Sequence, residues 1–290
     1  FFLANHDALT GLPNRSRFLE RLHEALINAD RDRTRVAVLL LDLDRFQVIN
    51  DTMGHHTGDQ FLKLVSKRLT QCVRETDTVA RLGGDEFVLI LTRLKSLSSA
   101  ELIAENVIHE LSKTYVVDNH EINSGASVGI AFYPQDGGDA GELLQKADLA
   151  MYRAKATGRG RYRVFAPGML TEIQQRRQQE EQLRSAVAQG EFDLVYQPQI
   201  DLETLQIAGV EALLRCRNSQ LMALSTRQII VLAEEMGLIV SLGAWVLDSA
   251  CRQIAQWRSL SASHANFLPE LAGFKVAVNI APAQLLATSF

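Results

Sequence analysis

Two adjacent carboxylates follow a pair of glycines near the middle of the first half of the chain. Gly83-Gly84-Asp85-Glu86 separates the run Val79–Leu82 from the run Phe87–Leu91, and both runs have the apolar character of β-strands. A short glycine-containing connection between two such runs indicates a β-hairpin. Glycines permit a tight turn and leave room for a bulky ligand. The hairpin therefore either ends in a solvated tip or presents Asp85 and Glu86 to a cation or a ligand.

A second pair of acids ends another apolar run. Val36–Leu41 is continuous and apolar, which is typical of a strand buried on both faces, and Asp42-Leu43-Asp44 follows it. Alternation along a strand places Asp42 and Asp44 on one side and Leu43 on the other. Carboxylate oxygens suit Mg²⁺, which also keeps water and phosphate oxygens as ligands. Two such ions can stabilise both the attacking and the leaving oxygen of a phosphoryl transfer. These acids therefore predict a divalent-cation site beside a nucleotide.

The bulk composition describes an ordinary globular chain. Its 290 residues are 47% hydrophobic and 22% charged, which suits about two domains. The net charge of −4 gives no support for nucleic-acid binding.

Cys72, Cys216 and Cys251 are widely spaced, so neither a disulfide framework nor a zinc site is predicted, and a cytoplasmic location is the simplest expectation. No apolar run has the ~18 residues of a membrane helix. Because the chain begins at Phe1 without a basic leader, we expect it to be a piece of a longer protein.

The elements around these acids alternate between helical and strand patterns, so we expect a mixed α/β first half with about five strands. Asp139, with Glu142 three residues later, predicts a capped helix that runs to Gly158. The other expected elements are a turn at 10–15, helices over 18–26, 61–69 and 100–111, and strands over 127–133 and 161–165.

The second half begins with a polar helical segment that lacks glycine and proline. Residues 169–189 are expected to form a linker helix between a domain at 1–168 and a domain at 190–290. Strand and helix patterns alternate after Gly190, which predicts βα units. We expect strands over 192–197, 208–214 and 274–280, and helices over 226–236 and 242–257.

Four separated segments of residues 1–168 resemble the GGDEF diguanylate cyclases, and they occur in that family's order: Asp7–Arg15, Asp42–Asp59, Gly83–Phe87 and Ala147–Arg161. The resemblance implies a palm-like fold related to the nucleotidyl cyclases, with a mixed sheet and flanking helices. It also implies that two GTP are condensed into cyclic di-GMP with release of pyrophosphate, using Mg²⁺ or Mn²⁺. One GTP in each subunit implies a homodimer, and a sensory domain is expected upstream.

The resemblance also assigns roles to single residues. Asp42, Asp85 and the Leu43 carbonyl would hold the metal, and Asp85 or Glu86 would be at or beside the general base for the 3′-hydroxyl. A charged acceptor at Asp59 and an amide at Asn50 suit the guanine edge. The implied GTP-binding residues are Phe46, Asn50, Asp59, Gly83, Gly84, Lys155 and Arg159.

Further positions carry alternative interpretations or depart from the family pattern. Lys155 and Arg159 share a helical face if the helix reaches that far, and without the resemblance they would merely complement a helix dipole. Arg74 and Asp77 resemble the RxxD product-inhibition site, although a surface ion pair of little energetic value has the same pattern. Gln47 replaces a lysine of many members, so we expect lower GTP affinity. His55 beside His56 is interpreted as structural, because no third ligand is spaced for zinc.

The second half resembles the opening of an EAL phosphodiesterase, a TIM-type βα barrel that hydrolyses cyclic di-GMP with two divalent metals. Glu211 and Asn279 would be metal ligands, and Gln197 and Arg215 would contact the substrate. About three of eight strands precede Phe290, so the barrel is expected to be incomplete and inactive as it stands. The residues after Arg215 also differ from the family pattern, at Cys216, Ser219, Met222 and Thr226.

These expectations leave several functions open. The first is an active cyclase. The second is a phosphodiesterase in the full-length parent, in which the first domain binds GTP as a regulator. The third is a non-catalytic receptor for cyclic di-GMP.

Overall fold

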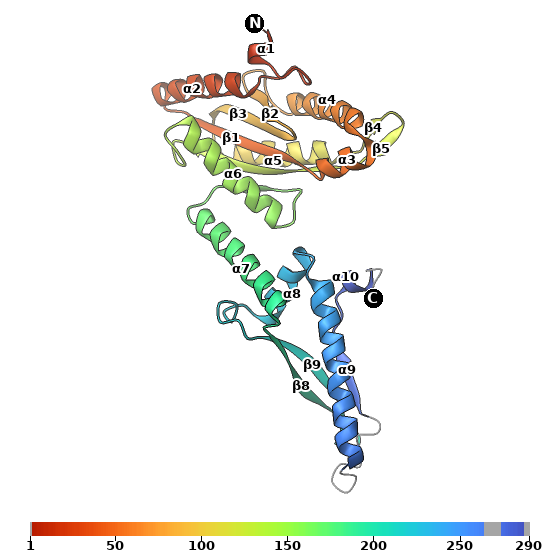
Figure 1. Ribbon diagram of the computed structural model, residues 1–290. Coiled ribbons are helices and arrows are strands. Elements are labelled where there is room, and N and C mark those ends of the chain that lie inside the picture. Colours follow the sequence, from red (N-terminus) through yellow and green to blue (C-terminus); the bar gives the residue numbers. More distant parts are fainter. Residues whose placement is uncertain (1, 264–273, 287–290) are drawn as a thin grey trace. The chain divides into compact units, whose positions relative to one another are not determined.

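The structure is a computed structural model that describes residues 2–263 and 274–286 (Figure 1). It divides into two compact units, Phe1–Ile173 and Gln174–Phe290. Among the described residues, no helix combines the length and the apolar character that crossing a membrane requires.

A five-stranded mixed sheet forms the centre of the first unit. Its order is β2-β3-β1-β6-β7, so β1 lies in the middle. β1 pairs antiparallel with β3 and with β6, and β7 is parallel to β6. The strands are β1 (Arg35–Asp44), β2 (Thr78–Gly83), β3 (Glu86–Leu94), β6 (Gly125–Tyr133) and β7 (Tyr162–Val164).

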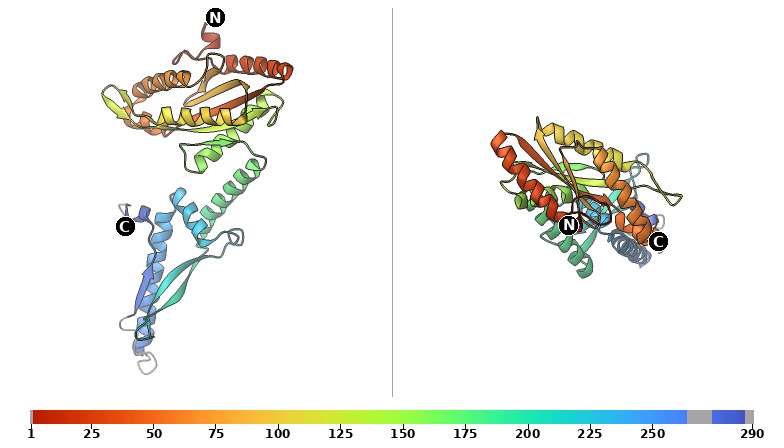
Figure 2. Two further views of the ribbon diagram at one scale, coloured as in Figure 1. Left: turned by 180° about the vertical axis from the view of Figure 1, so that it is seen from behind. Right: turned by 90° about the horizontal axis from the view of Figure 1, so that it is seen from above.

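Helices cover both faces of this sheet, as Figures 1 and 2 show. Alternate residues of β1 enter two different cores: Leu39 and Leu41 pack toward one side and Val38 and Leu40 toward the other. The first side is covered by α3 (Phe46–Met53), α4 (His55–Gln71) and α5 (Leu97–Ser112), and the second by α2 (Arg15–Asp32) and α6 (Ala140–Ala156). A strand that is apolar on both faces belongs in the middle of such a sandwich. The predicted palm-like α/β fold is confirmed.

Side chains cap the N-terminal ends of two helices in the first unit. The Asn14 side chain accepts the Arg17 N–H at the start of α2, after the short helix α1 (Phe2–Asn5). Asp139 likewise accepts the Glu142 N–H at the start of α6, as its spacing predicts.

The predicted end of α6 is wrong. The helix ends at Ala156, and the Thr157 hydroxyl and N–H both donate to the Arg153 carbonyl. Gly158 and Arg159 then adopt φ values of 117° and 54°, outside the helical region. Lys155 and Arg159 therefore do not share a helical face, because the glycine permits the chain to turn out of the helix before Arg159.

A small hairpin between α5 and β6 has no counterpart among the elements predicted from the sequence. It consists of β4 (Tyr115–Val117) and β5 (His120–Ile122), joined by Asp118 and Asn119. Both linking residues have positive φ, 49° and 65°. Asp and Asn tolerate this conformation, and their position between two short apolar runs is the signal that identifies the turn.

The second unit begins within α7 (Met169–Gln189), which occupies the predicted linker helix. Its sheet has the order β10-β9-β8, in which β9 and β10 are parallel. Parallel strands separated by helices form the predicted βα arrangement. β8 is antiparallel to β9, an orientation that periodicity alone does not reveal. The elements are β8 (Phe192–Ile200), β9 (Ile207–Cys216), α8 (Thr226–Glu235), α9 (Ile239–Ser263), β10 (Lys275–Val278) and α10 (Pro282–Leu285).

Candidate functional site

The two pairs of acids predicted from the sequence meet at one end of the sheet. Asp42 lies opposite Glu86 in the antiparallel register of β1 and β3. The Leu43 N–H donates to the Asp85 carbonyl at 3.4 Å, which joins the strand end to the hairpin tip. The pairing of two distant segments therefore brings three carboxylates into one neighbourhood.

A lysine from α6 contacts this group of acids. Lys155 Nζ lies 2.7 Å from Asp42 Oδ2, and the exposed fractions of the two side chains are 30% and 14%. Lys155 is on the last turn of α6, and Asp42 points toward the same side of the sheet. An ammonium group is a compact positive charge that can bind a carboxylate or a phosphate oxygen.

Burial and the neighbouring acids raise the pKa values of Asp42 and Glu86. Burial is the largest cause of the raised pKa of Asp42; Asp85 raises the pKa further, while the hydrogen bond from Lys155 opposes the shift. Burial also raises the pKa of Glu86, with added contributions from Asp42, Asp148 and Asp85. Unfavourable interaction among ionised carboxylates is what a bound cation relieves.

The donor set at this end of the sheet suits Mg²⁺ or Mn²⁺. The described residues contain no group of three or more His, Cys, Asp and Glu side chains that could hold a metal ion by themselves. The expected ligands are two carboxylates, Asp42 and Asp85, and the carbonyl of Leu43. Such a set fits an ion that keeps waters and takes substrate phosphate as ligands. Within the described residues, His55 and His56 belong to no metal-binding group.

Asp44 has different surroundings from Asp42, although both lie on one side of β1. The Asp44 carboxylate is buried, and it accepts a hydrogen bond from Ser127 Oγ at 2.8 Å and from the Gly160 N–H at 3.0 Å. Because both of its oxygens have donors within the protein, Asp44 is not a free cation ligand.

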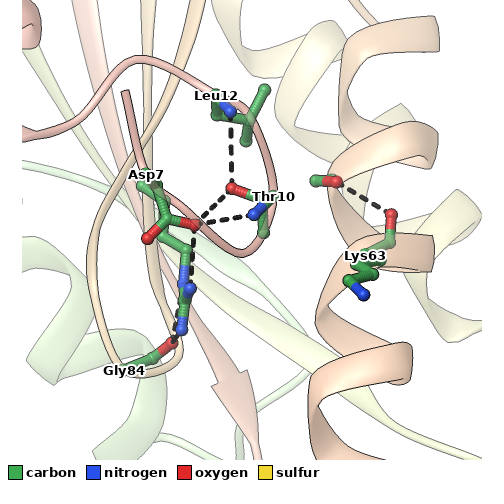
Figure 3. Close-up of polar contacts among 7 residues, drawn as sticks. Asp7, Thr10, Leu12, Lys63 and Gly84 are labelled. Atoms are coloured by element: carbon green, nitrogen blue, oxygen red, sulfur yellow. Dashed lines mark hydrogen bonds and ion pairs between the residues drawn. The ribbon is translucent and has the colours of Figure 1, made fainter. Parts of the chain in front are cut away.

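Arg81, for which no role was predicted from the sequence, braces the hairpin. Arg81 donates from Nε and Nη2 to the Gly84 carbonyl at 3.0 and 2.7 Å, and its Nη1 donates to Asp7 Oδ1 at 2.9 Å. Figure 3 shows Asp7 Oδ1 also accepting hydrogen bonds from the N–H and the hydroxyl of Thr10. Gly83 and Gly84 at the tip have positive φ, 146° and 53°. The N-terminal turn thus holds the hairpin in place.

The predicted guanine-reading residues lie on two adjoining helices. Asn50 belongs to α3, and Asp59 is an exposed residue of α4. A Cβ on Gly58 would lie 2.0 Å from Asn50 Oδ1 and 3.4 Å from the Phe46 ring, so Gly58 makes room for both side chains. Asn50 Oδ1 is buried and has no hydrogen-bond partner among residues 2–263 and 274–286. Leaving such an atom unpaired costs about 1–3 kcal/mol, which is commonly tolerated where a residue serves a site. Phe46 is itself buried in the core beside Phe61.

The predicted product-inhibition pair forms a turn. Asp77 Oδ2 accepts the Arg74 N–H at 3.2 Å, and Asp77 Oδ1 accepts the Thr92 N–H at 3.1 Å. Within the described residues no ion pair joins the two side chains, so the surface ion pair expected as the alternative is not formed. Asp77 instead fixes the turn before β2 against β3.

In the second unit, the predicted metal ligands are neighbours. Asn279 Nδ2 donates to Glu211 Oε1 at 2.7 Å, and Gln197 lies opposite Glu211 in the β8–β9 register. Arg215 and Asn279 both line a cavity of about 200 Å³. Arg215 Nη1 donates to the adjacent Leu214 carbonyl.

Comparisons with known proteins agree with both halves of the chain. The family described as "Diguanylate cyclase, GGDEF domain" matches residues 4–161, and the EAL domain matches residues 180–290. The bifunctional diguanylate cyclase/cyclic di-GMP phosphodiesterase MucR of Pseudomonas aeruginosa is 43% identical over 97% of this chain and 40% of its own length. The cyclic di-GMP phosphodiesterase NbdA of the same organism is 38% identical over 87% of this chain and 32% of its own length. The chain thus spans less than half of these relatives.

A solved structure of the GGDEF domain of TpbB (YfiN) from Pseudomonas aeruginosa is 41% identical to this chain. It covers 58% of this chain and 99% of its own, with a TM-score of 0.57. The GGDEF domain of DgcB from Caulobacter crescentus, solved with cyclic di-GMP, is 31% identical over 56% of this chain and 93% of its own, with a TM-score of 0.52. This chain belongs to the GGDEF family of cyclic di-GMP signalling proteins, and an EAL domain segment follows its GGDEF domain.

Proposed function

We propose that the first unit is an active diguanylate cyclase that condenses two GTP into cyclic di-GMP. The observation that supports this most strongly is the meeting of Asp42, Glu86 and Lys155 beside the Asp85 tip. A group of carboxylates with one ammonium suits a cation and a triphosphate better than it suits an apolar substrate.

In this proposal Asp42, Asp85 and the Leu43 carbonyl hold Mg²⁺ or Mn²⁺. When bound, the ion would neutralise charge on the phosphate oxygens. Lys155 would release Asp42 and move to the triphosphate, where Arg159 would join it. Asp85 or Glu86 would take the proton of the 3′-hydroxyl. The raised pKa of Glu86 brings its proton affinity nearer to that needed of a base at neutral pH.

Each bond-forming step links two nucleotides. The 3′-oxygen of one GTP forms a bond to the α-phosphorus of the other, and the bond from that phosphorus to pyrophosphate breaks. The same step in the opposite direction closes the ring and releases a second pyrophosphate. With one GTP per unit, the reaction requires two copies of the chain, so we propose a homodimer whose GTP sites face each other.

Asn50 and Asp59 would read the guanine edge, and the exposed glycines Gly83 and Gly84 would let the nucleotide approach the hairpin. Arg74 would contribute its guanidinium to a product-inhibition site, with Asp77 holding the turn that presents it. Gln47 lies on the exposed side of α3, and its replacement of a lysine would lower GTP affinity. The cytoplasm is the proposed location, and an upstream sensory domain is the proposed partner.

A second candidate function belongs to the EAL segment. The hydrogen bond between Asn279, just after the end of β10, and Glu211, in the middle of β9, supports a cation site with Gln197 opposite. In the whole protein this segment would contribute to a phosphodiesterase that the GGDEF unit regulates by binding GTP, or to a receptor that binds cyclic di-GMP without turnover. Production of pGpG from cyclic di-GMP by the full-length protein, without synthesis, would favour the phosphodiesterase; calorimetric binding without turnover would favour the receptor.

The cyclase proposal is tested by incubating the 290-residue chain with GTP and Mg²⁺ and following cyclic di-GMP by chromatography. Asp85→Ala should abolish product, and Asp118→Ala, in the β4–β5 turn, should leave it unchanged. A dimeric wild-type preparation that binds GTP and yields no product would refute the proposal.

A further inference from the structure

We propose that Asp44 is a positioning residue that holds the loop carrying Arg159 in place for the triphosphate. This inference rests on the proposed function, in which Arg159 contacts phosphate. It separates the roles of the two acids at the end of β1: Asp42 meets Lys155 directly, whereas Asp44 acts on Arg159 through the backbone.

The contact between Asp44 and the loop is direct. Asp44 Oδ2 accepts the Gly160 N–H at 3.0 Å, across 116 residues of sequence. Asp44 Oδ1 accepts from Ser127 Oγ at 2.8 Å, and the Ser124 hydroxyl donates to the Asp44 carbonyl at 3.0 Å. The carboxylate is therefore fixed by β6 while it holds the loop. Hydrogen bonds to an ionised acceptor are stronger than those between neutral groups.

The loop needs an external restraint because its backbone is unusual. Gly158, Arg159 and Gly160 have φ values of 117°, 54° and 57° in succession. Glycines adopt such values readily, but a side chain at Arg159 makes them unfavourable. The Arg159 residue is exposed, and within the described residues no ion pair fixes its guanidinium. Its direction therefore depends on how the backbone beside it is held.

The space around the carboxylate is restricted. A Cβ on Gly125, which lies opposite Asp44 in the β1–β6 register, would be 3.2 Å from Asp44 Oδ2 and 3.9 Å from the Gly160 Cα. A side chain at position 125 would therefore press on the carboxylate, which shows that the strand, the carboxylate and the loop are closely packed. A shorter residue at position 44 would leave the Gly160 N–H without its acceptor.

The test measures nucleotide binding by the 290-residue chain in a double-mutant cycle. The probe is the α,β-methylene analogue of GTP with Mg²⁺, which cannot transfer its α-phosphoryl group, and GMP is the comparison ligand. Arg159→Ala in the wild-type chain should weaken analogue binding about tenfold, the effect of one charge-assisted contact. Asp44→Ala should weaken it by a similar factor, and adding Arg159→Ala to Asp44→Ala should have little further effect. GMP affinity should stay within about twofold throughout, because its guanine contacts remain.

Matched variants separate positioning from folding. Ser127→Ala removes the other hydrogen bond to the same carboxylate and should weaken analogue binding by a smaller factor than Asp44→Ala, because Asp44 Oδ2 still accepts the Gly160 N–H. Asp44→Asn keeps an acceptor for Gly160 and should restore both binding and the effect of Arg159→Ala. Should Asp44→Ala fail to fold, Asp44→Ser replaces it in the cycle, because its hydroxyl is too short to reach the loop.

Three outcomes are decisive. If Arg159→Ala weakens analogue binding as much in the Asp44→Ala chain as in the wild type, the inference is wrong while the proposed function stands. If the wild-type chain binds the analogue and the cycle shows coupling, but no cyclic di-GMP is formed from GTP, the inference holds and the proposed synthesis fails. A wild-type chain that binds no analogue overturns both.

Discussion

Arg81 Nη1 lies 2.9 Å from Asp7 Oδ1, and the two residues are 74 positions apart in the chain. The same guanidinium donates twice to the Gly84 carbonyl at the hairpin tip. The two side chains are 10% and 22% exposed, so solvent screens this ion pair less than it screens a surface pair. The position of the tip is therefore linked to the N-terminal turn that precedes α2.

Removing this link should loosen the hairpin that carries Asp85. We expect Asp7→Asn to lower the free energy of unfolding of the first unit by about 1–2 kcal/mol. The reason is that Thr10 and Arg81 would no longer donate their hydrogen bonds to an ionised acceptor. Cyclic di-GMP synthesis should fall more than GTP affinity, since the tip positions the reacting groups. Urea unfolding and product assays measure the two effects. Glu20→Ala is the control, because its ion pair with Arg17 is exposed and should contribute little to stability.

The contribution of Asp7 should depend on pH. Burial alone would raise the pKa of Asp7, but hydrogen bonds from Thr10 and Arg81 outweigh burial and bring the pKa below its ordinary value of 3.8. An acid whose pKa is lower in the folded than in the unfolded state stabilises the protein at pH values above the pKa of the unfolded state. This stabilisation is lost as the pH falls through the pKa of the folded state. The stability difference between wild type and Asp7→Asn should thus be constant from pH 7 to about 5 and shrink below pH 3.8. A difference that stays unchanged to pH 3 would contradict this assignment.

Lys155 should compete with a divalent cation for Asp42. Their atoms are 2.7 Å apart, so Mg²⁺ without nucleotide must displace an ammonium. We expect Lys155→Met to strengthen binding of Mg²⁺ alone and to weaken binding of the Mg²⁺–GTP complex, because the triphosphate loses a cation. Calorimetry with each ligand measures both. Lys146→Met, on the same helix, is the control. If Lys155→Met weakened the binding of both ligands, Lys155 would not compete with Mg²⁺ for Asp42.

Gly58 should be necessary for the placement of Asn50. A Cβ at this position would lie 2.0 Å from Asn50 Oδ1, so Gly58→Ala must displace the amide. GTP affinity should fall about tenfold through loss of one guanine contact, while the helix gains up to about 1 kcal/mol in propensity from alanine. Binding and unfolding measurements together separate the two effects. Unchanged GTP affinity in a folded Gly58→Ala chain would remove Asn50 from the site.

Replacing Gly129, in contrast to Gly58, should lower the stability of the fold. A Cβ there would meet the Ala147 carbonyl oxygen at 1.9 Å and the Met151 nitrogen at 2.2 Å, where α6 crosses β6. Backbone atoms yield less easily than side-chain ends, so we expect Gly129→Ala to destabilise the first unit by about 1–3 kcal/mol. Thermal unfolding measures the loss. Retained stability would mean that α6 moves away from the sheet at little cost.

Much of this fold follows from local pattern. The continuous run before Asp42 predicts a central strand, alternation places Asp42 and Asp44 on one side, and the Asp139–Glu142 spacing predicts a cap that is formed. These features depend on residues close together in sequence, where periodicity and capping chemistry are informative.

The remaining features depend on long-range contacts. Residue spacing does not predict that Asp44 accepts the Gly160 N–H, because the two residues are far apart in the chain. It likewise does not predict that Arg81 joins Asp7 to the Gly84 carbonyl. The sequence predicts that α6 continues to Gly158, whereas the helix ends at Ala156, where the Thr157 hydroxyl and N–H both donate to the Arg153 carbonyl. The antiparallel β8 likewise has the same periodicity as a parallel strand.

Two copies of this chain, each with one GTP, should together make cyclic di-GMP. The decisive experiment measures product and pyrophosphate per protomer from GTP and Mg²⁺ over a range of protein concentrations. We expect two pyrophosphates for each cyclic di-GMP and a rate per protomer that rises with concentration until the dimer is complete. A folded, GTP-binding chain that releases no pyrophosphate at any concentration would contradict it.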